Sequence, residues 1–137
     1  MAIGEWLGRT APDLATIEQL ARSTLDDLPA AFREGASSVL LRVADFPPED
    51  VLEDMGVEDP FELSGLYDGI PLTEKSVMDV VDRPDMIWLF RRAILDEWAE
   101  RGDVTLGQLV AHITIHELAH HFGWSDEEIA RIDRWWE

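Results

Sequence analysis

The stretch "HELAHHFGWSD", from His116 to Asp126, holds three of the four histidines of the chain and two acidic residues. Residues four apart lie one turn apart on a helix, so His116 and His120 can bind one metal ion at about 2.0–2.1 Å per bond. Glu117 follows the first histidine directly, the HExxH spacing in which this carboxylate reaches a metal-bound water without ligating the metal. A zinc ion acidifies that water and polarises a carbonyl. The pattern therefore predicts hydrolysis with Glu117 as the general base.

Gly123 and Asp126 extend this pattern to HExxHxxGxxD. The glycine lets the chain reverse after the second histidine and brings Asp126 back as the third metal ligand. A structural role also explains Asp126, because acidic residues are favoured in the first turn of a helix that begins after Ser125. Both interpretations stay open here, and Glu127 or a water is the alternative third ligand.

Two further histidines lie on the same predicted helix. His112 extends the stripe of His116 by one turn, where it hydrogen-bonds a metal ligand, stabilises a developing oxyanion or, more commonly, simply borders the cleft. His121 points about 100° away from His120 around the helix. We expect His121 at the surface or beside the ligands, and not as a ligand.

No residue matches a separate oxyanion-stabilising motif by its spacing. Tyr67, the only tyrosine, lies in a turn-rich segment that can fold over a cleft, although its ring more commonly packs on the core. Arg91 and Arg92 are the other candidates, and a surface ion-pairing role is the more common one for such a pair.

The helix that carries the histidines has clear ends in the sequence. Thr105 with Gln108 three residues later forms a capping-box pattern, and Gly123 supplies a left-handed stop, which predicts a helix from Leu106 to Phe122. A second capping-box pattern follows it. That pattern opens a last helix whose inward-facing residues are Ile129, Ile132 and Trp136.

The preceding chain alternates helical and extended patterns. Apolar spacing predicts a first helix from Leu14 to Leu28, limited by Pro29. After a link over residues 33–38 comes a strand from Ser38 to Ala44. A short helix then ends at Gly56.

Turn residues dominate residues 59–84, which we interpret as a shaped loop with one candidate strand, Val77 to Val81. The dense apolar pattern from Met86 to Phe90 predicts a strand that leads into a helix ending at Gly102. One continuous helix after Pro84 is the alternative.

Composition restricts the class of protein. A chain of 137 residues with 46% hydrophobic content fits one domain, residues 1–137. Its formal net charge of −18 disfavours nucleic-acid and anionic-membrane partners and is compatible with a metal ion or a basic peptide, or with a solvated acidic surface. Without cysteine there is no thiolate zinc site, so His and carboxylate must bind the metal. With no signal or membrane-spanning pattern in the sequence, we predict a cytoplasmic protein.

The sequence resembles the small bacterial zincin-like metallopeptidases, a family of single-domain proteins with HExxHxxGxxD near the C-terminus. The stretches that carry the likeness are "HELAHHFGWSD" from His116, "GLYDGIPL" from Gly65, "IWLFRRAIL" from Ile87 and "LDDLPAAF" from Leu25. The resemblance implies an α+β, minimal zincin-like fold in which a small mixed sheet packs against helices. It also implies one zinc ion per chain, ligated by His116, His120 and Asp126, with Glu117 as the base.

The resemblance further suggests that "SSVLLRVAD" from Ser37 lies near the cleft, where an extended peptide can add to a sheet edge. The leading hypothesis is a zinc-dependent peptidase acting on a peptide or protein substrate. The alternatives are a metal-stabilised binding module with little turnover and a metal-free acidic interaction surface. The oligomeric state is open, because Trp135 and Trp136 at the C-terminus are compatible with a monomer or a homodimer.

Overall fold

The structure is a computed structural model, and it describes residues 4–69, 84–123 and 127. Its centre is a three-stranded mixed sheet in the order β1-β3-β2, formed by β1 (Leu40–Ala44), β3 (Met86–Phe90) and β2 (Gly65–Asp68). β1 runs parallel to β3, and β2 runs antiparallel to it. The predicted α+β class with a small mixed sheet is therefore confirmed.

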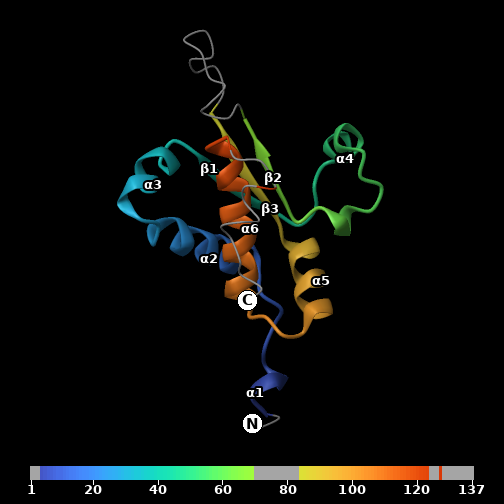
Figure 1. Ribbon diagram of the computed structural model, residues 1–137. Coiled ribbons are helices and arrows are strands. Elements are labelled where there is room, and N and C mark those ends of the chain that lie inside the picture. The colour runs from blue at the N-terminus through green and yellow to red at the C-terminus, as the bar shows by residue number, and fades with distance from the viewer. Residues whose placement is uncertain (1–3, 70–83, 124–126, 128–137) are drawn as a thin grey trace.

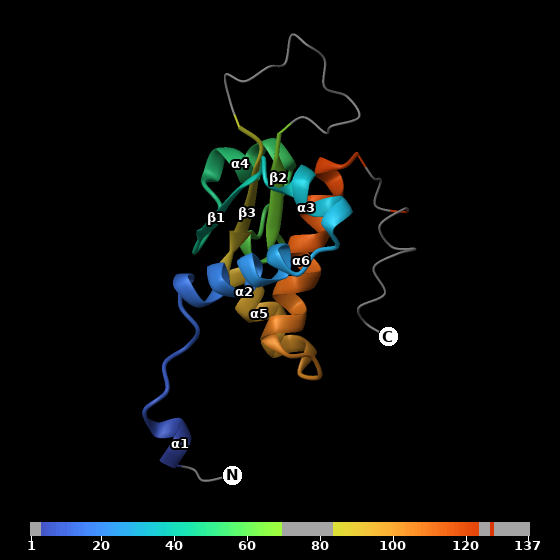
Figure 2. The ribbon, with the colours of Figure 1, turned by 90° about the vertical axis from the view of Figure 1, so that its left-hand side faces the viewer.

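Two long helices cover one face of this sheet. They are α2 (Leu14–Asp26) and α6 (Leu106–His121), which lie side by side against the strands (Figures 1 and 2). The N-cap residue of α2 is Asp13, whose carboxylate accepts a hydrogen bond of 2.8 Å from the backbone N–H of Thr16. The remaining helical elements are α1 (Gly4–Leu7), α3 (Ala30–Ala36), α4 (Glu49–Met55), the 3-10 helix η1 (Pro60–Glu62) and α5 (Arg91–Arg101).

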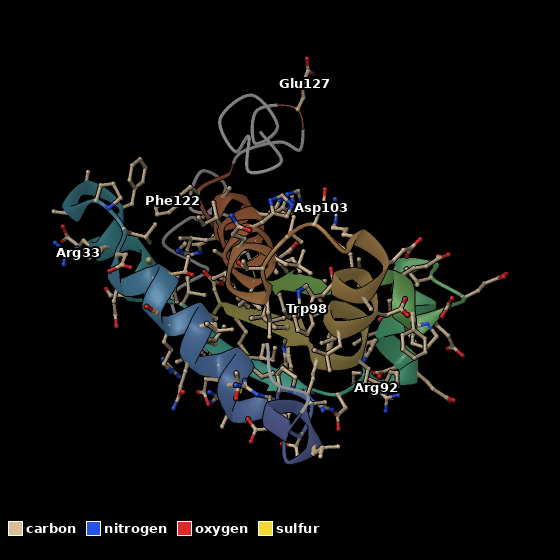
Figure 3. All side chains as sticks on the ribbon, turned by 90° about the horizontal axis from the view of Figure 1, so that it is seen from below. Arg33, Arg92, Trp98, Asp103, Phe122 and Glu127 are labelled. Carbon is tan, nitrogen blue, oxygen red and sulfur yellow. The ribbon has the colours of Figure 1, made fainter. Side chains whose placement is uncertain are left out.

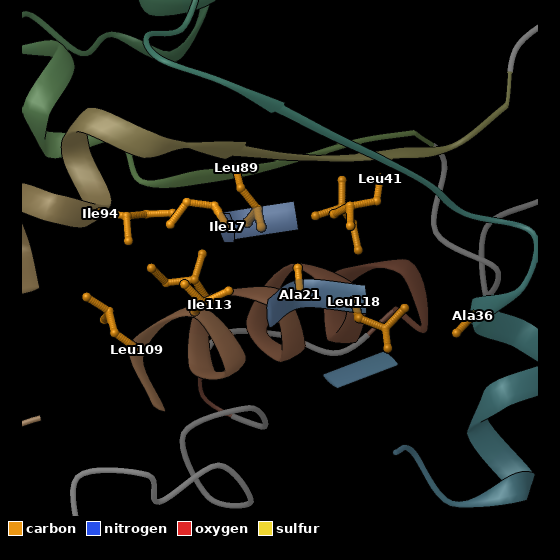
Figure 4. Close-up of a cluster of buried hydrophobic side chains, with 11 residues drawn as sticks. Ile17, Ala21, Ala36, Leu41, Leu89, Ile94, Leu109, Ile113 and Leu118 are labelled. Atoms are coloured by element: carbon orange, nitrogen blue, oxygen red, sulfur yellow. The ribbon is translucent and has the colours of Figure 1, made fainter. Parts of the chain in front are cut away.

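The main core lies between the sheet and these two helices. Because side chains alternate along a strand, Ile87 and Leu89 of β3 point to the same face, and both have no exposed surface. Figure 4 shows Leu41 and Leu89 pointing from the strands toward the helical layer that includes Ile113 and Leu118 of α6. This packing fixes α6 against the sheet.

Both ends of α6 follow from local sequence. The Thr105 hydroxyl accepts from the Gln108 N–H at 3.0 Å, and the Gln108 side chain accepts from the Thr105 N–H at 2.9 Å. Gly123, after the C-cap residue Phe122, has a φ of 85°, the left-handed conformation that glycine adopts without strain. The predicted capping box and glycine stop are confirmed.

The opposite face of the sheet carries a smaller cluster. Phe90 and Ala93 are buried there with Leu63, and α4 packs against the cluster only through half-buried side chains. In the part of the chain that the structure describes, α4 has no buried residue. This face is consequently less completely covered than the one under α2 and α6.

Most predicted elements are present, and two interpretations were wrong. β3 leads directly into α5, which ends at Gly102 with a φ of 72°, so the single continuous helix is excluded. The turn-rich interpretation of residues 59–84 missed β2, and four residues of the expected link over 33–38 belong to α3.

The candidate strand Val77 to Val81 and the last helix lie outside the described residues. No described helix has the length and apolar character needed to cross a membrane.

Candidate metal centre

The structure brings together the three residues at the centre of the histidine motif. Ligand atoms of His116, Glu117 and His120 all lie within 4.8 Å of one another. The two imidazole rings, one turn apart on α6, have centroids 5.0 Å apart. Two imidazoles one helical turn apart are ligands that zinc accepts, and in the HExxH spacing the neighbouring carboxylate reaches a metal-bound water. The residue types of the cluster therefore fit a zinc site.

Close contact between β2 and α6 closes one side of this cluster. A side chain at Gly65 would place its Cβ 2.7 Å from Cγ2 of Ile113 and 3.3 Å from Cγ of Glu117. Only glycine lets the strand lie this close to the helix. As a result Glu117 is just 8% exposed although it belongs to a polar cluster.

A pocket of about 290 Å³ opens beside the cluster. His116 and Glu117 form part of its wall, together with His112 one turn earlier on α6. Ser64 and Gly65, where β2 begins, also line it. Arg101 at the end of α5 also lines it. The pocket lies next to the cluster, between the end of α5, α6 and the start of β2.

Of the residues that the sequence suggested as oxyanion stabilisers, His112 is the one that lines this pocket. Arg91 instead donates to the carbonyl of Pro12 at 2.6 Å and pairs with Asp45 at 3.0 Å. The guanidinium of Arg92 lies 5.4 Å from the ring centroid of Phe46, on the side of α4 (Figure 3). Neither arginine lines the pocket.

Arg101 is a pocket residue that reasoning from the sequence missed. It forms an ion pair of 2.9 Å with Glu97, one turn earlier on α5. The i,i+4 spacing was visible in the sequence and predicts the pair. Its position beside His116 was not visible, because it depends on the turn between α5 and α6. Trp98 supports that turn, lying between the two helices (Figure 3) and donating to the carbonyl of Val104 at 3.0 Å.

His121 is fully buried, so the surface position, one of the two alternatives expected for it, is wrong. Its Nδ1 lies 2.9 Å from the Tyr67 hydroxyl and 3.2 Å from the Asp85 carboxylate. Its Nε2 lies 3.2 Å from the carbonyl of Gly35. Because a carbonyl only accepts, Nε2 donates this hydrogen bond. The rotation of about 100° that turns His121 away from His120 points it into a contact between α6, α3, β2 and the start of β3.

Tyr67 is held in this contact and does not fold over the pocket. Burial, followed by the nearby Asp85 carboxylate, raises the pKa of Tyr67 well above its usual value. Its ring packs against the main core and makes an edge contact with His121, with centroids 5.6 Å apart. The more common packing role considered for Tyr67 is the one observed, together with a hydrogen bond to the buried histidine.

Two other expectations concern the rim of the site. Asp126, predicted as the third ligand, lies outside the described residues, so its position stays a prediction. The segment "SSVLLRVAD", expected near the cleft, forms β1 at the opposite edge of the sheet from β2. The sheet edge beside the pocket is β2.

Comparison with models of protein families identifies the family of this chain. The sequence model of the zincin-like metallopeptidases matches residues 36–136, most of the chain. The match includes the whole of α6 and all the residues that line the pocket beside the cluster. A search of curated proteins found none that matches the chain.

Proposed function

Because the chain belongs to the zincin-like metallopeptidase family, we propose that it is a zinc-dependent peptidase that hydrolyses peptide bonds in a peptide or protein substrate. The observation that carries the proposal is the cluster of His116, Glu117 and His120 beside an open pocket. Membership of this family indicates the reaction, peptide-bond hydrolysis, and the cluster contains the residue types that metal-assisted hydrolysis requires.

In this proposal His116 and His120 hold one zinc ion per chain, with Asp126 as the third ligand. When bound, zinc supplies Lewis acidity, which polarises the substrate carbonyl and acidifies water. Two histidines and one carboxylate leave a fourth position open, as catalytic zinc sites require. The helical spacing of the two histidines supports their role, and the glycine turn at Gly123, with a φ of 85°, supports a chain reversal toward Asp126.

Glu117 acts as the general base. Its carboxylate takes a proton from the attacking water and later delivers it to the amine nitrogen that leaves. Burial of Glu117 close to Gly65 restricts its side chain, which keeps the carboxylate oriented for both transfers. If Glu117 ligated the metal instead, the proposed reaction would lack this base. The two roles therefore predict different zinc contents for a Glu117 variant.

His112 is our proposed donor to the carbonyl oxygen. It lies one turn from His116, with ring centroids 6.1 Å apart, and lines the same pocket. A positioned donor at such an oxygen contributes about 10²–10³-fold to the rate. The location in the cytoplasm and the single-domain organisation stay predictions from the sequence.

Glu117→Gln tests the proposal. We expect peptide hydrolysis to fall by about 10²–10⁴-fold, the usual contribution of a general base, while elemental analysis still finds one zinc per chain. Glu53→Gln, an exposed residue of α4, is the matched control and should retain full activity.

Three outcomes would count against the proposal. Equal activity of wild type and Glu117→Gln would exclude the base, and loss of zinc in Glu117→Gln would indicate a ligand instead. A wild-type protein that hydrolyses nothing across a broad peptide library, yet loses thermal stability on chelation, would favour the metal-stabilised binding module.

A further inference from the structure

A second, larger pocket lies on the face of the sheet that faces away from α2 and α6. Its volume is about 560 Å³. Leu66 of β2 and Trp88 and Phe90 of β3 line it, and their alternation with the core residues Ile87 and Leu89 places them on this opposite face. The Trp88 and Phe90 rings are stacked, with centroids 6.3 Å apart and planes 10° apart. The pocket therefore has an apolar, largely aromatic floor.

In the part of the chain that the structure describes, α4 covers this floor only in part. α4 forms one wall of the pocket, stands apart from α2 and α6 (Figure 1) and has no buried residue. Met55 at its C-terminal end lines the pocket and is 48% exposed. A half-covered aromatic surface is a common feature of sites that bind a partner.

The rim of the pocket determines which partner fits. Asp50 and Asp54 project from α4, and Asp68 lies at the end of β2. Among the described residues that line this pocket, none is basic. The pocket beside His116 differs, since Arg101 lies in its wall. The two exposed carboxylates of α4, Asp50 and Asp54, beside an aromatic floor favour a ligand that is both apolar and positively charged.

We propose that this second pocket binds a basic peptide segment that has an apolar side chain next to lysine or arginine. The apolar side chain rests on Trp88 and Leu66, and the cationic groups approach Asp50 and Asp54. The net charge of −18 adds a long-range attraction that accelerates the encounter and weakens with salt.

The position of β2 links this pocket to the candidate metal centre. Gly65 contacts α6 at the metal centre, while Leu66 and Asp68 of the same four-residue strand line the second pocket. A partner bound in the second pocket therefore lies on the other side of the strand that borders the cleft. The binding itself is independent of whether the metal centre hydrolyses peptides.

A set of three blocked tripeptides tests the proposal on the full-length protein: acetyl-Lys-Phe-Lys-amide and its counterparts with glutamine or glutamate in place of lysine. Titration is followed by the NMR signal of the Trp88 indole N–H, assigned with Trp88→Phe, and mass spectrometry verifies that each probe stays intact. We expect the lysine probe to shift this signal, with an affinity at least about tenfold above that of the glutamine probe. The glutamate probe should not bind.

Two double variants of α4 identify the charges that matter. Asp50→Asn with Asp54→Asn should weaken binding of the lysine probe about tenfold, because the variant loses the combined binding free energy of two exposed ion pairs. Glu49→Gln with Glu53→Gln removes two charges from the same helix but none from the pocket lining, and should change the affinity less than about twofold.

Each of the following results would overturn the proposal. They are equal affinity for the lysine and glutamine probes, equal losses in the two double variants, and binding that shifts signals of α6 without shifting that of Trp88. Loss of hydrolysis in Glu117→Gln bears only on the metal centre, so the two proposals fail separately.

Discussion

The two faces of the sheet differ in how completely helices cover them. Under α2 and α6 the side chains of Ile87 and Leu89 are fully buried, and the same packing holds the helix that carries His116 and His120. On the other face α4 has no buried residue and a pocket of about 560 Å³ remains. The face under α2 and α6 thus gives the candidate metal centre a rigid support, whereas the described residues leave apolar surface on the other face, where we propose that a partner binds.

The difference between the two faces can be tested by removing a leucine side chain from each. Leu89→Ala deletes a fully buried leucine of the closed face and should lower the free energy of unfolding by about 2–5 kcal/mol. Leu66→Ala affects a half-buried residue of the open face and should cost about 1 kcal/mol. Urea denaturation measures both, and equal losses would contradict the difference between the faces.

A smaller effect is expected at the start of α6. Thr105→Ala removes the side-chain cap, and the free energy of unfolding should fall by about 1 kcal/mol because the backbone N–H of Gln108 loses its acceptor. Thr10→Ala, the same change at an exposed site outside the helices, should stay within about 0.5 kcal/mol of wild type. A Thr105→Ala protein as stable as the control would show that packing alone fixes this end of the helix.

The smallest effect is confined to alkaline pH. Burial and Asp85 raise the pKa of Tyr67, so above the unfolded value of about 10 the native state keeps a proton that the unfolded state loses. The stabilisation is complete below that pH and declines as pH rises. Tyr67→Phe lacks the hydrogen bond to His121, so it should be less stable than wild type at pH 8, and the gap should narrow by pH 11.

The alkaline titration has a direct optical check. Tyr67 is the only tyrosine, so phenolate absorbance in the native protein reports this residue alone and should appear only above pH 10. A phenolate that forms at or below pH 10, or a stability gap that widens with pH, would contradict the buried contact with His121.

Those features that depend on neighbouring residues in the sequence could be predicted. The helix start at Thr105, the stop at Gly123 and the shared face of His116 and His120 all follow from spacings of three or four residues. The same reasoning identified the strand that becomes β3, because its dense apolar pattern precedes a helix with a glycine stop.

Long-range features could not be predicted in this way. β2 has only four residues between turn signals, and it exists because Tyr67 and its neighbours pair with β3, about twenty residues later in the chain. The burial of His121 was missed for the same reason, since Gly35 and Asp85 come from distant segments. The sequence could place His121 on a different side of the helix from His120, but not show that this side is covered.

The central claim is that His116 and His120 hold one zinc ion, and elemental analysis of protein purified without added metal tests it most directly. We predict one zinc per wild-type chain and a loss of most of that zinc in His116→Ala and in His120→Ala, with His112→Ala retaining it. Wild-type protein that stays free of zinc after zinc is added, or histidine variants that bind as much as wild type, would contradict the claim.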